Sequence, residues 1–125
     1  MNNPETLKFA KSHEWLAPDG TVGISDHAQK EITDVVFVDL PKVGREVKAG
    51  EAIAVVESVK AAFDIYAPIA GKISKVNNDV SKNPALVNQA PYGNGWLFAI
   101  QKGAGSDDSH LLDNTAYQTS LTEEH

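Results

Sequence analysis

The chain has 125 residues, which fits one domain, and its 42% hydrophobic and 22% charged content is ordinary for a soluble globular protein. It contains no cysteine, so disulfides, thiolate metal sites and cysteine nucleophiles are excluded, and any sulfur chemistry must come from a cofactor. Seventeen acidic residues against eleven basic ones give a net charge of −6. This balance argues against a nucleic-acid partner, which would require a basic stripe. We expect a single domain over residues 1–125.

The N-terminal sequence MNNPETLKFAKSHEW lacks the apolar core of a secretory signal and the arginine-rich amphipathic pattern of a transit peptide. No apolar run approaches the length that spans a bilayer, so we expect no membrane partner. The sequence therefore predicts a cytoplasmic protein, either bacterial or, after removal of a presequence, resident in the mitochondrial matrix.

Strand signals open the chain. Residues 7–10 and 21–24 flank a turn at residues 18–20, with the sequence Pro-Asp-Gly. Apolar and β-branched runs on either side of such a turn are typical of a β-hairpin. We predict a hairpin here, with Trp15 and Leu16 on its first arm.

A short helix is predicted next, at residues 25–33. We predict Asp26 as its N-cap, with Gln29 three residues further on, the spacing of a capping box. Ala28 and Ile32 lie one turn apart, so both fall on the face that we expect to be buried.

The middle of the chain carries further strand signals. Residues 34–40 form a β-branched and aromatic run that Pro41 stops. Residues 43–50 predict a turn, a short strand and a second turn. Residues 53–56 and 63–66 are apolar runs on either side of a short segment, and they predict a second β-hairpin.

The rest of the chain alternates short strands with turns. Residues 68–76 predict a turn and a strand of alternating polarity, and residues 77–79 predict a turn. Residues 83–87 predict a brief helical turn, with asparagine as N-cap and proline at the first helical position. Residues 96–100 predict a last strand, and about 111–124 a C-terminal helix. Many short strands at regular spacing favour an all-β fold, which we expect to be a flattened, barrel-like sandwich with short accessory helices.

The segment Glu57-Ser58-Val59-Lys60-Ala61 joins the two strands of the second predicted hairpin. A lysine that is modified and then moves between enzymes must stand clear of the core at a hairpin tip, where an enzyme can reach it. The strands beneath it must be stiff, so that the flexible side chain has a fixed base. An ordinary turn lysine would simply be solvated, and the position alone does not decide between the two.

The local sequence VESVKAAFDIYAPIAGKI resembles the lipoyl-lysine hairpin of the glycine cleavage system H proteins. The resemblance runs from SHEW at residues 12–15 to GWLF at residues 95–98 and into the C-terminal segment. A biotin carrier would be expected to have methionine on both sides of its lysine, and lipoyl domains of the 2-oxoacid dehydrogenases typically have Asp-Lys-Ala. Val59 and Ala61 fit neither of these patterns.

The resemblance implies that lipoate is attached to Lys60 by an amide bond. It implies a barrel-sandwich hybrid of the lipoyl and biotinyl carrier type. It also implies that Glu57 helps a lipoate-attaching enzyme to recognise the hairpin, although a solvated carboxylate at a strand end is an equal alternative from the residues alone.

The resemblance further implies a cleft formed by Ser12, Glu14 and Asp64, which would hold an S-aminomethyl group on the lipoyl arm. A hydroxyl and two carboxylates suit the ammonium of that group. Without the resemblance, both acids would be read as surface residues. His13 is expected to be a packed or hydrogen-bonded neighbour of the cleft, because the other histidines lack metal-ligand spacing with it. We expect no metal site and no catalytic residue.

The partners implied by the resemblance are glycine decarboxylase (P protein), aminomethyltransferase (T protein), dihydrolipoyl dehydrogenase (L protein) and a lipoate-attaching enzyme. The protein would carry the aminomethyl intermediate from the first to the second and be reoxidised by the third. Two alternatives stay open, a lipoyl or biotinyl domain that serves another complex and an H-like protein that relays lipoate to other proteins. An independent enzyme is the least favoured alternative.

Overall fold

The computed structural model describes residues 3–103 and 106–123, and this part of the chain contains ten short strands. The strands are β1 (Lys8–Phe9), β2 (Glu14–Leu16), β3 (Thr21–Ile24), β4 (Val35–Asp39), β5 (Glu46–Val47), β6 (Ala52–Ser58), β7 (Ala62–Tyr66), β8 (Gly71–Val76), β9 (Phe98–Lys102) and β10 (Leu112–Asp113). One sheet has seven strands in the order β10-β1-β2-β3-β9-β8-β5, and the other has three in the order β4-β6-β7. All strand pairs are antiparallel.

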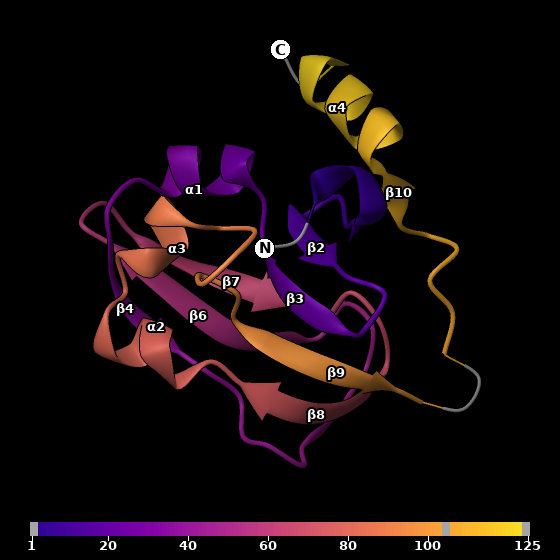
Figure 1. The fold of residues 1–125 in the computed structure, drawn as a ribbon, viewed down its shortest axis with the longest axis horizontal. Helices are drawn as coiled ribbons and strands as arrows, with labels where there is room; N and C mark the ends of the chain where they lie inside the picture. Colours follow the sequence, from indigo (N-terminus) through magenta and orange to yellow (C-terminus); the bar gives the residue numbers. More distant parts are fainter. Residues whose placement is uncertain (1–2, 104–105, 124–125) are drawn as a thin grey trace.

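The two sheets pack on each other as a sandwich (Figure 1). Alternate side chains of each strand point inward, so both sheets contribute to one apolar core. Val22 and Phe98 come from the larger sheet and Val56 and Ile65 from the smaller one, and none of the four is more than 3% exposed. The predicted all-β sandwich is confirmed, and the described strands do not close into a barrel.

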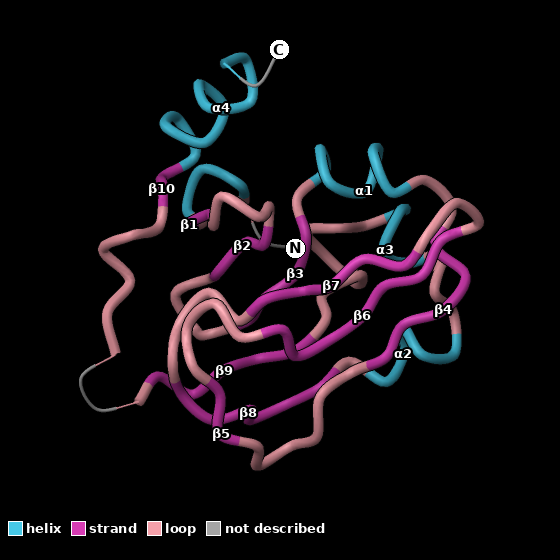
Figure 2. Tube along the Cα trace, turned by 180° about the vertical axis from the view of Figure 1, so that it is seen from behind, coloured by secondary structure: helices cyan, strands magenta, loops and turns pink. Residues whose placement is uncertain are grey.

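Short helices accompany the sheets. They are the 3-10 turn η1 (Pro4–Thr6) and the helices α1 (Asp26–Ile32), α2 (Asn78–Lys82), α3 (Leu86–Gln89) and α4 (Asn114–Glu123). Helices α1, α2 and α3 lie together at one end of the sandwich, whereas α4 stands apart from them beside β10 and η1 (Figures 1 and 2). Within the described ranges, none of the helices combines the length and the hydropathy needed to cross a bilayer.

A second, smaller apolar cluster fixes α4 to the larger sheet. Its buried members are Leu7, Phe9, Trp15, Ala17 and Tyr117. The indole of Trp15 is fully buried, and its Nε1 donates hydrogen bonds to the carbonyl oxygens of Ile24 and Pro91, each over 3.0 Å. A buried indole N–H needs such a partner, so Trp15 anchors this cluster by packing and by polar contacts together.

The second predicted hairpin is confirmed, and the first is confirmed for the arm that carries Trp15 and Leu16, whereas residues 8–9 form a separate strand, β1, that pairs with β2. Strands β2 and β3 pair across the turn at residues 17–20, and β6 and β7 pair from Ala52 opposite Tyr66 to Glu57 opposite Ala62. The first turn requires glycine, because Gly20 has a φ of 93° and a Cβ atom there would lie 2.2 Å from the Ile100 carbonyl oxygen.

The N-cap predicted for α1 is one residue too late. Ser25, not Asp26, is the N-cap, and its Oγ accepts from the Ala28 backbone N–H over 3.1 Å. Asp26 is instead the first helical residue. Its carboxylate accepts a hydrogen bond from the Gln29 side chain and interacts favourably with the positive end of the helix dipole. Burial of Ala28 and Ile32 is confirmed.

Three other boundaries differ from the predictions. The predicted turn at residues 77–79 is the start of α2, whose N-cap is Asn77. The helical turn predicted from residue 83 begins later, as α3, and Asn83 does not cap it. The C-terminal helix begins at Asn114 rather than near residue 111, because residues 112–113 pair with β1 as strand β10. The predicted end of this helix at residue 124 lies outside the described residues.

The connection between α1 and β4 is held by one side chain. Asn88 of α3 donates from Nδ2 to the Thr33 carbonyl oxygen over 2.8 Å, and its Oδ1 accepts from the Val35 N–H over 2.9 Å. Thr33 has a φ of 69°, which is a rare conformation for a β-branched residue. The Asn88 amide therefore holds a strained connection in place.

We predict that Asn88→Ala lowers the free energy of unfolding by about 1–3 kcal/mol, because a backbone donor and a backbone acceptor lose their partner. Urea unfolding measures the loss. Asn83→Ala, which truncates an exposed asparagine in the neighbouring loop, is the matched control. Equal stability of the two variants would show that Asn88 does not hold this connection.

Candidate functional site

The tip of the β6–β7 hairpin is a tight turn built on Ser58. The Ser58 N–H donates to the Ala61 carbonyl oxygen over 2.8 Å. The Ser58 Oγ accepts from the backbone N–H groups of Lys60 and Ala61, over 3.1 and 3.2 Å. This places Val59, which is 70% exposed, and Lys60 at the outermost positions of the turn. The serine hydroxyl fixes the backbone from which the lysine side chain projects.

The hairpin tip lies against the end of α1. The Lys60 Nζ donates to the Glu31 carbonyl oxygen over 2.9 Å, and the Val59 N–H donates to the Asp34 carbonyl oxygen over 3.1 Å. Carbonyl groups in the last turn of a helix lack intrahelical donors and attract cations. Lys60 stays exposed in this contact, so its amine is accessible to an enzyme.

Glu57 is exposed on β6, three residues before Lys60. In the register of the small sheet it lies between Phe37 on β4 and Ala62 on β7. Phe37 is 50% exposed, so a carboxylate and an aromatic ring lie side by side on the outer face near the tip. The predicted recognition role of Glu57 stays a prediction.

Glu14 is 1% exposed, although it carries a carboxylate. Its Oε1 accepts a short hydrogen bond from the Ser12 hydroxyl, and its Oε2 accepts from the Tyr66 backbone N–H over 3.0 Å. Burial raises the pKa of Glu14 above its ordinary value, because desolvation disfavours the charged form more than these two hydrogen bonds favour it. The structure thus brings Ser12 and the β2 residue Glu14 together beside the end of β7.

A groove lies beside the hydrogen-bond partners of this carboxylate, and Glu14 itself is not among the residues that line it. Ser12 and Tyr66, the two residues whose donors Glu14 accepts, both line it, and the groove has a volume of about 560 Å³. Its other walls include Pro68 and His110, whose Nε2 lies 2.9 Å from the Pro68 carbonyl oxygen. The groove offers a small, mostly apolar space next to a hydroxyl and a buried carboxylate.

Asp64 does not join this pair. It is exposed on β7, opposite Val55, and no hydrogen bond within residues 3–103 and 106–123 connects it to Ser12 or Glu14. Because alternate residues of a strand share a face, Asp64 lies on the same side of β7 as Tyr66. It therefore stands on the strand between the hairpin tip and the groove.

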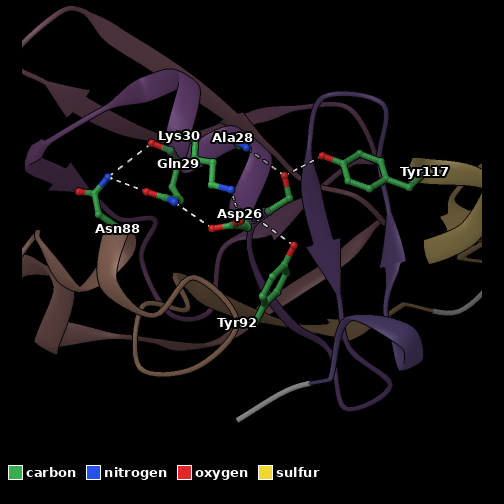
Figure 3. A network of polar contacts seen from close by, with 8 residues as sticks. Asp26, Ala28, Gln29, Lys30, Asn88, Tyr92 and Tyr117 are labelled. Carbon is green, nitrogen blue, oxygen red and sulfur yellow. Dashed lines mark hydrogen bonds and ion pairs between the residues drawn. The ribbon is translucent and has the colours of Figure 1, made fainter. Parts of the chain in front are cut away.

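Sequence reasoning missed one residue near the groove. The Tyr117 hydroxyl oxygen lies 2.6 Å from Ser25 Oγ, the contact marked by the dashed line from Tyr117 in Figure 3. It also lies 2.7 Å from His13 Nδ1. The expected hydrogen bonding of His13 is confirmed, and its place beside an intermediate-binding cleft stays a prediction. Tyr117 is 104 residues away from His13, so no local pattern could reveal the contact. The described residues contain no cluster of three or more potential metal ligands.

The raised pKa of Glu14 predicts how stability depends on pH. The ordinary value is 4.5, and the folded protein has a higher one, so the folded state binds more protons than the unfolded state between the two values. Stability therefore falls as pH rises through this window. Glu14→Gln keeps the shape and has no charge to desolvate. We expect the free energy of unfolding of this variant, relative to that of the wild type, to increase as the pH rises above about 4.5.

Urea unfolding at about pH 4 and about pH 7 measures this difference, because the linkage term is absent below the window and present above it. Glu46→Gln, a change at an exposed carboxylate on β5, is the control and should follow the wild type. Parallel pH profiles of the wild type and Glu14→Gln would contradict the prediction.

Comparison with known proteins gives one consistent result. The family model described as "Glycine cleavage H-protein" matches residues 7–124. The glycine cleavage system H protein of Deinococcus deserti is 62% identical over 117 residues, covering 94% of this chain and 96% of the relative. That of Deinococcus radiodurans is 58% identical over 115 residues, covering 92% and 93%.

A solved structure agrees with these relatives. The crystal structure of a glycine cleavage system H protein from Mycobacterium marinum matches with a TM-score of 0.86 and 37% identity, over 96% of this chain and 99% of that one. The fold, the hairpin with its lysine and the matches over nearly the whole sequence lead to the same conclusion: the chain belongs to the glycine cleavage H-protein family.

Proposed function

We propose that this protein is the lipoyl carrier of a glycine cleavage system and that lipoate is attached to the Nζ atom of Lys60. The observation that carries the proposal is the exposed lysine on a turn fixed by Ser58, at the end of the stiff β6–β7 hairpin. An amide at Lys60 removes its positive charge and with it the attraction to the end of α1. The residues around Lys60 thus fit an arm that is anchored at one end and otherwise mobile.

The whole chain, residues 1–125, would act as one carrier domain without catalytic residues of its own. Its partners would be glycine decarboxylase, aminomethyltransferase, dihydrolipoyl dehydrogenase and a lipoate-attaching enzyme. When bound at Lys60, the lipoyl group would supply a disulfide that opens to carry the aminomethyl unit on one sulfur and a thiol on the other. Loss of the unit would leave a dithiol, which dihydrolipoyl dehydrogenase would reoxidise to the disulfide. The bacterial relatives support a bacterial cytoplasm as the place of this cycle.

The groove at Ser12 and Glu14 would shelter the loaded arm. An aminomethyl group carries an ammonium near neutral pH, and the Glu14 carboxylate offers it a charge-assisted hydrogen bond in a site with little water. The four strand steps from Ala62 to Tyr66 span about 13 Å, so the arm must lie along β7 to reach the groove. Asp64 lies on that route, where its exposed carboxylate would attract the same ammonium.

Lys60→Arg should abolish lipoylation and carrier activity together while the fold stays intact, because the guanidinium cannot be acylated by the attaching enzyme and the side chain packs little. Intact mass with a peptide map after expression with lipoate, followed by glycine–bicarbonate exchange, gives the result.

Lys72→Arg, a change at another exposed lysine, is the control. Exchange retained by Lys60→Arg at saturating protein would refute the assignment. A biotinyl mass on the wild-type protein would indicate a carrier for another complex, and a strain that needs this protein to lipoylate its dehydrogenases would favour the relay function.

Glu14→Gln and Asp64→Asn should shorten the lifetime of the aminomethylated protein and spare the attachment of lipoate. Each removes one charged partner of the ammonium, and a charged, sheltered hydrogen bond contributes about 1.5–3 kcal/mol. The corresponding change is roughly 10- to 150-fold at the sheltered Glu14. At the exposed Asp64 the effect should be smaller, because water screens the charge.

Release of formaldehyde and ammonia from the loaded protein is the assay. Glu46→Gln controls for the loss of a carboxylate elsewhere on the surface. If the double variant releases its cargo at the wild-type rate, the groove does not shelter the aminomethyl group.

A further inference from the structure

The Tyr117 side chain connects the C-terminal helix to the segment that carries Ser12 and Glu14. Tyr117 is 1% exposed, and its ring stacks on Phe9 with centroids 4.3 Å apart and planes 5° from parallel. This stack directs the hydroxyl group away from α4, toward His13 and Ser25. The ring fixes the position of the hydroxyl, and the hydroxyl then makes two contacts with other elements.

His13 is held in a strained backbone conformation. Its φ of 78° lies in the left-handed region, which is strained for a residue other than glycine and persists only where the surroundings impose it. Backbone hydrogen bonds hold both sides of the residue, from its N–H to Ala10 and from Ser25 to its carbonyl oxygen, each over 2.9 Å. His13 lies between Ser12 and Glu14, so its dihedral angles decide whether these two side chains meet.

The hydroxyl of Tyr117 can hold both His13 and Ser25, because it can donate one hydrogen bond and accept another at the same time. The Ser25 Oγ accepts from Ala28 in the N-cap of α1, which leaves the serine hydrogen free to point toward the Tyr117 oxygen. The Tyr117 hydrogen then points toward His13 Nδ1. A phenylalanine at this position keeps the ring stack and loses both hydrogen bonds.

We propose that Tyr117 is a positioning residue for the groove, which holds His13 in its left-handed conformation and so keeps the Ser12 hydroxyl on the Glu14 carboxylate. The proposal rests on the proposed function of the groove, because that function gives the positioning a purpose. Tyr117 does not line the groove itself. The C-terminal helix thereby contributes to cargo protection through one hydroxyl group.

The test compares Tyr117→Phe with Tyr92→Phe. The Tyr92 hydroxyl accepts from the Asp26 N–H over 3.0 Å, so the control removes the same group at the same end of α1 without a contact to His13. The first readout is the titration of the Glu14 carboxyl carbon by NMR in the unmodified protein. If His13 relaxes, Glu14 loses the Ser12 hydrogen bond that favours its charged form, and its titration midpoint moves to higher pH.

The second readout is the lifetime of the aminomethylated protein. We expect Tyr117→Phe to shorten it about fivefold, the factor that corresponds to one neutral hydrogen bond of about 1 kcal/mol. Tyr92→Phe should leave both readouts at the wild-type value. Asparagine tolerates the left-handed region. His13→Asn added to Tyr117→Phe should therefore move the titration midpoint of Glu14 part of the way back to the wild-type value.

Three results would overturn the positioning role of Tyr117. They are an unchanged Glu14 titration midpoint in Tyr117→Phe, an equal shift of that midpoint in Tyr92→Phe, and a midpoint that does not move back toward the wild-type value when His13→Asn is added. A shifted titration with an unchanged lifetime would support the positioning role and overturn the sheltering function of the groove. Thermal unfolding of all variants shows whether they are folded, and the NMR titration is read only on folded protein.

Discussion

The buried carboxylate of Glu14 connects the two sheets of this protein. It belongs to β2 of the larger sheet and accepts from the Tyr66 N–H on β7, the edge strand of the smaller one. A buried carboxylate is costly unless its oxygens have donors, and here one oxygen takes the Tyr66 N–H and the other the Ser12 hydroxyl. The raised pKa shows that these donors do not fully offset the desolvation.

Helix α1 links that carboxylate to Lys60, the proposed site of lipoate attachment. At its beginning, the cap residue Ser25 contacts the Tyr117 hydroxyl, which contacts His13. At its end, the carbonyl oxygen of Glu31 accepts from the Lys60 ammonium. Seven helical residues span about 10 Å, so one short rigid element lies between the base of the arm and the groove that would receive its end. A lipoyl arm on Lys60 would then move while its base and the groove stay fixed.

Local sequence patterns were sufficient for the hairpin that carries Lys60, because apolar runs and turn residues are properties of neighbours. They failed where distant residues decide. Residues 77–79 form the start of a helix since the Asn77 side chain also donates to the carbonyl oxygens of Asn94 and Trp96. The C-terminal helix starts late because β1, about a hundred residues earlier, pairs with residues 112–113. The resemblance implied a role for Ser12 and Glu14, yet neither the contact of Glu14 with Tyr66 nor the contact of Tyr117 with His13 has any signal in the sequence.

The same imbalance that raises the pKa of Glu14 would make the groove selective for a cation. While the groove is empty, burial favours the protonated acid, and a neutral side chain costs the fold less. An ammonium placed against the carboxylate favours the ionised form instead, so cargo binding and proton release are linked. An oxidised or empty arm has no positive charge and gains nothing from this change. A ligand shifts an equilibrium only by its preference for one state, and here that preference comes from the charge of the aminomethyl group. The buried acid would therefore hold a loaded arm and release an unloaded one without any rearrangement of the backbone.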